Sequence, residues 1–125
     1  MPASTANLDI DGATPSVEII VGNAHFARFE FFLYDATGAN PRLIGGGRND
    51  DNIPDVVEIT NPPLSGLDRT TIFWRAVVTS QTGTPDEKYA VTVRVLQGDK
   101  IAGTDFKSDL LTTLPPKGFI RLQVR

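Results

Sequence analysis

The fold is decided by residues 70–106, which read TTIFWRAVVTSQTGTPDEKYAVTVRVLQGDKIAGTDF. The middle of this stretch, residues 88–97, alternates strictly between two kinds of side chain. One face of it would carry a tyrosine and three valines, namely Tyr89, Val91, Val93 and Val95. A period of two in a segment rich in β-branched residues is typical of a half-buried β-strand.

The segments on either side behave in the same way. Residues 70–79 place a second apolar row on one face, formed by Ile72, Trp74, Ala76 and Val78. Gly98 and Asp99 suit the positive φ angles of a tight hairpin turn, after which residues 100–106 form a third strand. The sequence therefore predicts a meander of three consecutive strands at the middle of a β-protein.

The rest of the chain supplies shorter segments of strand character between turn signals. They are residues 7–10, 17–21, 24–34, 42–44, 56–59 and 119–125. Residues 108–113 are ambiguous, because Ser108 and Asp109 could cap one helical turn or residues 110–114 could form a strand. No segment keeps a helical period over three turns. We therefore expect a single domain over residues 1–125. Its predicted fold is all-β, an antiparallel β-sandwich of about eight strands with Greek-key connections of the immunoglobulin, fibronectin III or jelly-roll kind.

Residues 24–34 have two distinct rows. One row is apolar throughout, and the other mixes charged and aromatic side chains, namely Phe26, Arg28, Glu30, Phe32 and Tyr34. The mixed row has two interpretations: loops cover its end, or it forms an exposed aromatic patch at an interface. The second interpretation makes Phe26, Phe32 and Tyr34 candidate interface residues.

Composition excludes several classes of chemistry. The chain has no cysteine and one histidine, so disulfides and thiolate catalysis are excluded. The lack of cysteine favours a reducing compartment such as the cytoplasm. The first six residues have neither a basic region nor an apolar region, so we expect no signal peptide. No apolar run is long enough for insertion into a membrane.

The net charge of −3 conceals an asymmetry, because acids dominate before residue 88 and basic residues dominate after it. The surface could be dipolar and pair with another copy or a charged partner, or strands from the two halves could alternate and mix their charges. The basic residues occur singly, without a cluster or interleaved aromatics, which predicts no nucleic-acid binding.

A resemblance exists at the level of the fold. The segment from Asp86 to Val93 (DEKYAVTV) resembles the penultimate strand of immunoglobulin-like and fibronectin type III domains, in which a tyrosine precedes the core pattern. The resemblance implies that Trp74 is the core tryptophan. The sequence departs from that pattern because Trp74 lies only one hairpin before Tyr89, and two further strand-like segments follow Phe106.

The densest group of oxygen ligands is NDDNIPD, residues 49–55. Calcium prefers several carboxylate and amide oxygens, and sandwich loops often supply them as clustered Asp and Asn. The predicted ligands are Asp50, Asp51 and Asp55, with Asp35 or Asp68 completing the shell. Asn49 and Asn52 are the accompanying polar binding residues. The spacing does not match an EF-hand, and the same residues are also ordinary turn formers.

The triple glycine at residues 45–47 is followed by neither a Lys-Ser/Thr pair nor a helix pattern. It therefore predicts a bend or bulge and not a phosphate loop.

Catalytic signals are weaker. His25 is the only histidine, and Ser65 has only one of the two glycines that flank a nucleophile elbow. Carboxylates on separate loops could meet as a hydrolase pair. A carbohydrate site would use Tyr34 with Asn40 or Asn49.

These patterns favour a non-enzymatic module that acts through protein–protein contacts or self-association, without a cofactor. A calcium-assisted module that recognises carbohydrate or another ligand is the first alternative. A small carboxylate-dependent hydrolase is the second.

Overall fold

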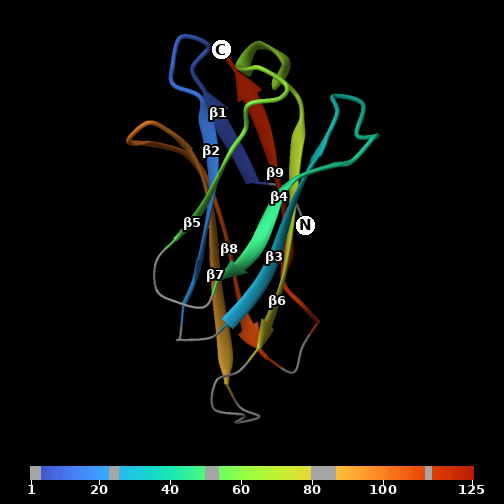
Figure 1. Cartoon of the computed structure of the whole chain (residues 1–125), viewed down its shortest axis with the longest axis vertical. Helices are drawn as coiled ribbons and strands as arrows, with labels where there is room; N and C mark the ends of the chain where they lie inside the picture. The colour runs from blue at the N-terminus through green and yellow to red at the C-terminus, as the bar shows by residue number, and fades with distance from the viewer. Residues whose placement is uncertain (1–3, 23–25, 50–53, 80–86, 112–113) are drawn as a thin grey trace.

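The computed structural model confirms a β-sandwich and describes residues 4–22, 26–49, 54–79, 87–111 and 114–125 (Figure 1). This part of the chain forms nine strands and one short 3-10 turn (Leu64–Gly66). None of its helical segments is long and apolar enough to cross a lipid bilayer. The strands are β1 (Ser4–Leu8), β2 (Pro15–Val21), β3 (Phe26–Tyr34), β4 (Arg42–Asn49), β5 (Asp55–Glu58), β6 (Thr71–Thr79), β7 (Lys88–Gln97), β8 (Lys100–Leu110) and β9 (Lys117–Val124).

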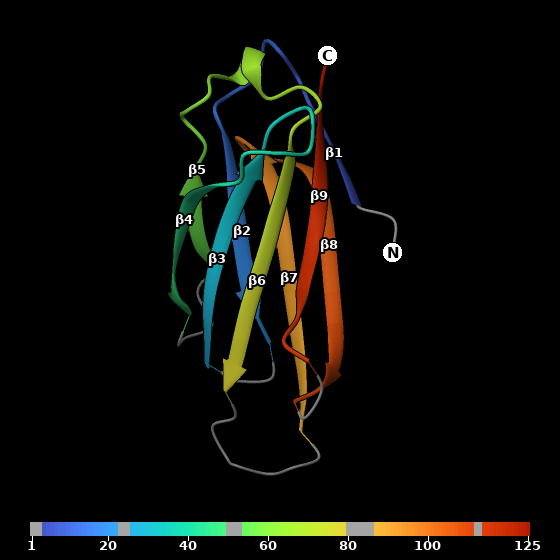
Figure 2. The same cartoon turned by 90° about the vertical axis from the view of Figure 1, so that its right-hand side faces the viewer.

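The strands form two sheets that pack face to face. One sheet has the order β1-β9-β6-β3-β4 and the other β5-β2-β7-β8. All pairs are antiparallel except β1 and β9. Along one side β4 lies beside β5, and along the other β1 lies between β8 and β9 (Figure 2). Around the sandwich the strands therefore follow the order β4-β3-β6-β9-β1-β8-β7-β2-β5. In this order β2–β5 form one Greek key and β6–β9 form a second, with β1 inserted between β9 and β8.

The predicted meander is wrong in one respect. The β7–β8 hairpin is confirmed, with Gly98 at φ +59° in its turn. However, β6 pairs with β3 and β9 in the other sheet. An alternating strand has one apolar face whether the next strand lies beside it or opposite it, so the pattern alone does not distinguish the two arrangements.

The core lies between the two sheets and consists of the predicted apolar rows. Trp74 and Phe31 are the largest fully buried side chains, and the valines of β7 face them from the opposite sheet. Trp74 is thus a core residue, as expected. The alternation of the four long strands decides this burial, since every second residue points inward.

Several strand boundaries differ from the predictions. The first strand is Ser4–Leu8 and ends before Ile10, which is exposed. Strand β8 continues to Leu110, so Ser108 and Asp109 belong to a strand and do not cap a helical turn, and Leu111 is a turn residue and not part of a new strand. The boundaries shift because hydrogen-bond partners, and not side-chain patterns, determine where a strand ends.

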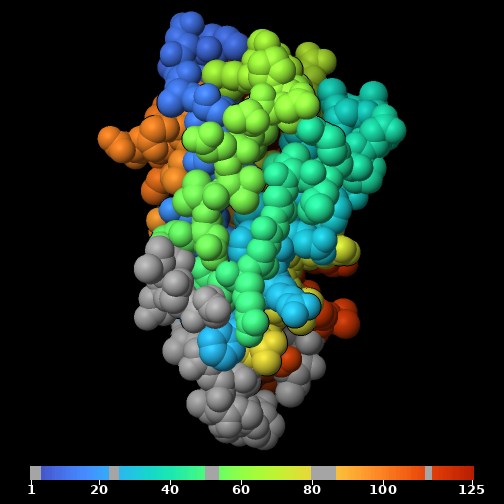
Figure 3. Space-filling model, in the orientation of Figure 1, coloured from blue at the N-terminus to red at the C-terminus, as the bar shows by residue number. Residues whose placement is uncertain are grey.

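Strand β4 extends through the triple glycine, and the predicted bulge is present. Phe31 pairs with Gly45 and Phe32 with Leu43, so Ile44 is the extra residue. A Cβ on Gly45 would lie 2.6 Å from Val57, on the neighbouring strand β5. The glycine thus allows the two sheets to approach each other on the side shown in Figure 3, where β4 and β5 run together.

Candidate binding face

The outward face of the five-stranded sheet carries a row of aromatic side chains that crosses three strands. The strand register aligns Phe32 of β3 with Phe73 of β6 and Phe119 of β9. The ring centroids are 6.1 Å apart for Phe32 and Phe73 and 5.0 Å apart for Phe73 and Phe119. Tyr34 meets Phe73 edge-on at 6.5 Å. We call these four residues the aromatic row.

The aromatic row is half-buried by its own rings and is exposed at both ends. Phe119 is 44% exposed, and Leu43, which pairs with Phe32 at the other end, is 56% exposed. Val77, on the same face of β6, is 57% exposed. The aromatic row and Leu43 form an apolar patch, which is typical of binding sites, and the charged pair Glu30 and Arg75 separates it from Val77. The structure therefore places Phe32 and Tyr34 in a shared patch, whereas Phe26 lies further along β3.

Basic side chains surround the aromatic row. The same outward face carries five of them and one acidic residue, Glu30; the basic residues are Arg28, Arg48, Arg75, Lys117 and Arg121. Arg75 bonds Glu30 through Nε at 2.8 Å and through Nη2 at 2.7 Å, and its guanidinium lies 5.1 Å from the Phe32 ring centroid. The chain is acidic overall, so this face has the opposite sign to the rest of the molecule.

Two adjoining hollows lie on this face, and a third continues from them to β8, at the side of the sandwich. The first, of about 370 Å³, lies among Phe26, Arg28, Arg48 and Val77. The second, of about 390 Å³, shares Arg28 and Val77 with the first and reaches Pro115. The third, of about 450 Å³, begins at Pro115 and opens between β9 and β8. We call the three hollows together the basic trough.

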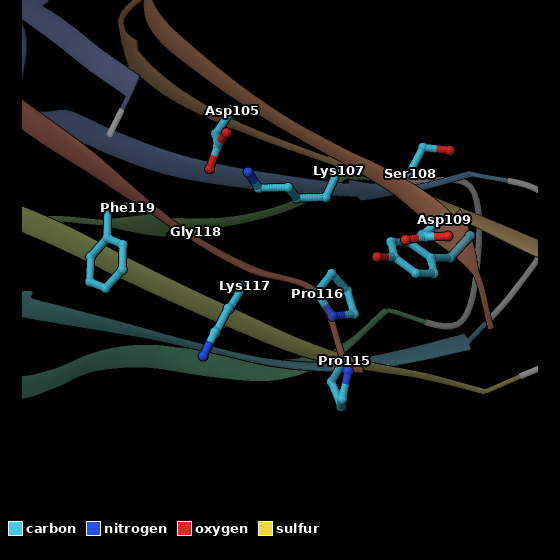
Figure 4. Close-up of a pocket in the computed structure, with 10 residues that line it drawn as sticks. Asp105, Lys107, Ser108, Asp109, Pro115, Pro116, Lys117, Gly118 and Phe119 are labelled. Atoms are coloured by element: carbon cyan, nitrogen blue, oxygen red, sulfur yellow. The ribbon is translucent and has the colours of Figure 1, made fainter. Parts of the chain in front are cut away.

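The third hollow lies further along β8 and β9 than the pairing of β1. Strand β1 pairs with Ile120–Val124, whereas the hollow is lined by residues within 105–109 and 115–119. Lys107 of β8 extends toward Asp105, while the side chains of Lys117 and Phe119 on β9 point away from these two residues (Figure 4).

Asp105 forms the inner wall of that hollow and ties the sheets together. Its Oδ2 accepts a hydrogen bond of 2.8 Å from the indole Nε1 of Trp74. Its Oδ1 accepts bonds from the Ser4 hydroxyl at 3.2 Å and from the Phe106 backbone N–H at 3.0 Å. Because both carboxylate oxygens already accept hydrogen bonds, the role of Asp105 is structural.

The predicted calcium site falls largely outside the described residues. Asp50, Asp51, Asn52 and His25 all lie there. Asn49 and Asp55 are described, and the structure brings them together: Asn49 is buried at the end of β4, and its Nδ2 donates to Asp55 Oδ2 at 2.6 Å. Within the described ranges, no three His, Cys, Asp or Glu side chains gather as a metal site. Calcium binding by this loop stays a prediction.

Asp35 and Asp68 are wrong as partners for that loop. Asp35 follows the last residue of β3, whereas Asn49 pairs with Ala27 near its first. Eight residues of strand separate the two ends by about 26 Å. Asp68 lies at the far end too, where its Oδ1 accepts from the Val124 N–H at 2.9 Å. The order of residues along the chain gave no indication of this distance.

Asp35 closes its own turn. Its carboxylate accepts bonds from the Thr37 hydroxyl at 2.6 Å, the Ala39 N–H at 3.0 Å and the Asn40 amide at 2.7 Å. The Thr37 hydroxyl is the largest cause, followed by the other donors, of a pKa lowered from 3.8 to about 2. Tyr34 and Asn40 line a small hollow of about 200 Å³ beside this turn, while Asn49 lies at the opposite end of β3.

Three residues of the candidate face, Phe119, Arg75 and Lys117, are not predicted from the sequence, while Phe73 could be read there only as part of a sugar-stacking platform with Phe26, Phe32, Tyr34 and Trp74. Phe73 and the first three residues each lie on the outward row of their strand, and those rows were readable from the alternation. What was missing was the register that sets β9 beside β6 and β6 beside β3. Basic residues that occur singly along the chain gather on one face because of that register, so the second interpretation of the charge asymmetry, alternation of charges within the sheets, does not describe this face.

Comparisons with known proteins give little guidance on function. No protein-family model matches the chain, and no curated protein matches it. Among solved structures, the chain is similar to a protein described as a DUF4425 family protein from Bacteroides ovatus ATCC 8483, with 12% sequence identity and a TM-score of 0.47. The match covers 88% of this chain and 95% of the other. Similarity at this level carries no argument about function, which is therefore argued from the site.

Proposed function

We propose that the protein is a non-enzymatic binding module, and that it docks a protein partner on the outward face of the five-stranded sheet. The observation that carries the proposal is the aromatic row with its exposed ends. Aromatic and arginine side chains are the residue types that dominate protein–protein interfaces. On this face they lie together on a rigid sheet, where they need little reordering to bind.

The arrangement of polar groups supports binding over catalysis. The most buried carboxylate beside the third hollow, Asp105, is held by Trp74, Ser4 and its own strand. A catalytic carboxylate needs an oxygen available to substrate or water. The charged residues of the outward face instead lie at the rim of an apolar patch, as in an interface.

A random-peptide library displayed on phage tests this proposal. Panning against the chain should enrich peptides that lose binding when Phe119 is changed in Phe119→Ser. Phe119 is exposed, so the substitution leaves the core intact, and its loss removes the end of the aromatic row. An about tenfold or greater loss of affinity is expected for an exposed interface aromatic.

The matched control is Phe106→Ser. Phe106 is 56% exposed and lies on the outward face of the other sheet, so the change in chemistry is the same on the opposite side. Peptides that bind Phe119→Ser as tightly as the unchanged protein, or that are lost with Phe106→Ser, would overturn the proposal. Light scattering at two protein concentrations tests whether the partner is a second copy of the chain. Self-association that disappears with Phe119→Ser would show that it is.

A further inference from the structure

We infer that the partner presents an extended acidic segment, which lies in the basic trough with apolar side chains against Val77 and Phe119. This inference rests on the proposed function and specifies its ligand. The three hollows are lined by five basic residues (Arg28, Arg48, Arg75, Lys107 and Lys117) and three acidic ones (Glu30, Asp105 and Asp109). Glu30 is paired with Arg75, and both carboxylate oxygens of Asp105 accept hydrogen bonds, so the lining keeps a net positive charge that negative charge on the partner would complement.

The shape of the trough sets the size of the segment. The three hollows run across β4, β3, β6 and β9 and end at β8, joined through Arg28, Val77 and Pro115. Strands β4 to β9 span three spacings of about 4.8 Å, and β8 lies about 10 Å further in the other sheet, so the trough is about 24 Å long. An extended chain covers that length with about seven residues. Gly46, which pairs with Glu30, has no side chain to block the β4 end.

The charges are placed to read carboxylates along this path. Arg48 and Arg28 pair across β4 and β3 at one end, and Lys117 lies at the other, opposite Arg75 on β6. Arg28, Arg48 and Lys117 are exposed, so a bound chain would desolvate them in part. Arginine binds carboxylates with two parallel hydrogen bonds, which adds directional specificity.

The rings argue against single-stranded nucleic acid, the other anionic polymer that suits a basic face with aromatics. Bases stack on the open faces of aromatic rings. Here Phe32 and Phe73 are stacked at 29°, and Phe73 and Phe119 are tilted by 32°. The Arg75 guanidinium lies over Phe32, and that of Arg48 lies 5.8 Å from the Phe26 centroid. The faces of Phe32 and Phe26 are thus already in contact with guanidinium groups, which leaves less ring surface for a base to stack on.

The probe is a synthetic fluorescent peptide of about eight residues that repeats Glu-Leu-Asp-Phe, long enough for the trough. Its control repeats Gln-Leu-Asn-Phe, which keeps the apolar side chains and removes the charges. We expect the acidic peptide to bind at least about tenfold more tightly at low salt, and the advantage to shrink as salt screens it.

Charge reversal on the protein locates the site. Arg28→Glu and Lys117→Glu should each weaken the acidic peptide by about tenfold. Lys100→Glu makes the same change of charge at the β7–β8 turn, away from the trough, and should leave the affinity within about twofold. Equal loss in all three variants would mean that only net charge matters and would overturn the inference.

The remaining outcomes separate this inference from the proposed function. If both peptides bind the face equally and Phe119→Ser abolishes both, the acidic partner is overturned while the docking face stands. If neither peptide binds, the inference is overturned, and library panning alone decides the proposed function. The inference is also overturned, in favour of nucleic acid, if an oligothymidylate binds more tightly than the acidic peptide and that binding is lost with Phe119→Ser.

Discussion

Trp74 Nε1 donates a hydrogen bond of 2.8 Å to Asp105 Oδ2, and this bond joins the centre of one sheet to the edge strand of the other. Trp74 is fully buried and Asp105 is 8% exposed. An indole N–H inside a core needs an acceptor, because an unpaired buried donor is costly. The pair thus satisfies the tryptophan and holds β8 against the five-stranded sheet.

Removing the acceptor should destabilise the fold. Asp105→Ala leaves the Trp74 indole unpaired and should lower the free energy of unfolding by about 2–3 kcal/mol. Asp105→Asn keeps an acceptor oxygen and should cost about 1 kcal/mol. Urea unfolding followed by the fluorescence of Trp74, the only tryptophan, measures both. Glu58→Ala on an exposed strand is the control, expected within about 0.5 kcal/mol of the unchanged protein.

Gly118 should tolerate no side chain. A Cβ there would overlap the Asp105 carboxylate and lie 2.6 Å from Trp74 Nε1. Gly118→Ala should therefore lower the free energy of unfolding by about 1–3 kcal/mol, as overpacked sites do. Gly47→Ala is the matched strand control, since its nearest neighbour would be the Phe29 ring at 3.5 Å, an ordinary contact. Equal stability of the two variants would contradict the close approach at Gly118.

The Asp35 turn should lose stability in acid. Its folded-state pKa is lowered to about 2 from 3.8, chiefly by the Thr37 hydroxyl. A lowered pKa contributes stability that is complete above the unfolded value and is lost as the pH falls from about 4 through 2. An NMR titration should give a midpoint near 2 for the Asp35 carboxyl. In Thr37→Val the midpoint should move upward, and a midpoint that stays in place would refute the assignment.

The calcium hypothesis for residues 49–55 predicts a ligand-dependent melting temperature. A site occupied at one hundred times its Kd stabilises the folded state by about 2.7 kcal/mol. Calcium should then raise Tm by several degrees over chelator, and Asp55→Ala should abolish the difference. An unchanged Tm removes calcium at ordinary affinities and leaves Asp55 with the structural role of accepting the Asn49 amide.

The period-two pattern was sufficient to predict the class of fold and most of the core. Alternation in residues 88–97 identified β7 with its correct ends, and alternation in residues 70–79 placed Trp74 inside. These features are local, because each residue's orientation in a strand follows from its two neighbours. The triple glycine predicted a bend or bulge, and the bulge lies beside it, at Ile44, while the three glycines themselves pair regularly with β3.

Register and sheet membership came only from the tertiary structure. Alternation says which side chains share a face, but it does not say which strand lies alongside, so β6 was assigned to the wrong partners. The candidate face depends on that missing information. Phe32, Phe73 and Phe119 are far apart in sequence and meet only because β3, β6 and β9 pair in that order. The same pairing gathers single basic residues into one positive surface on an acidic chain, since charge along a sequence becomes a field only once strand order is fixed.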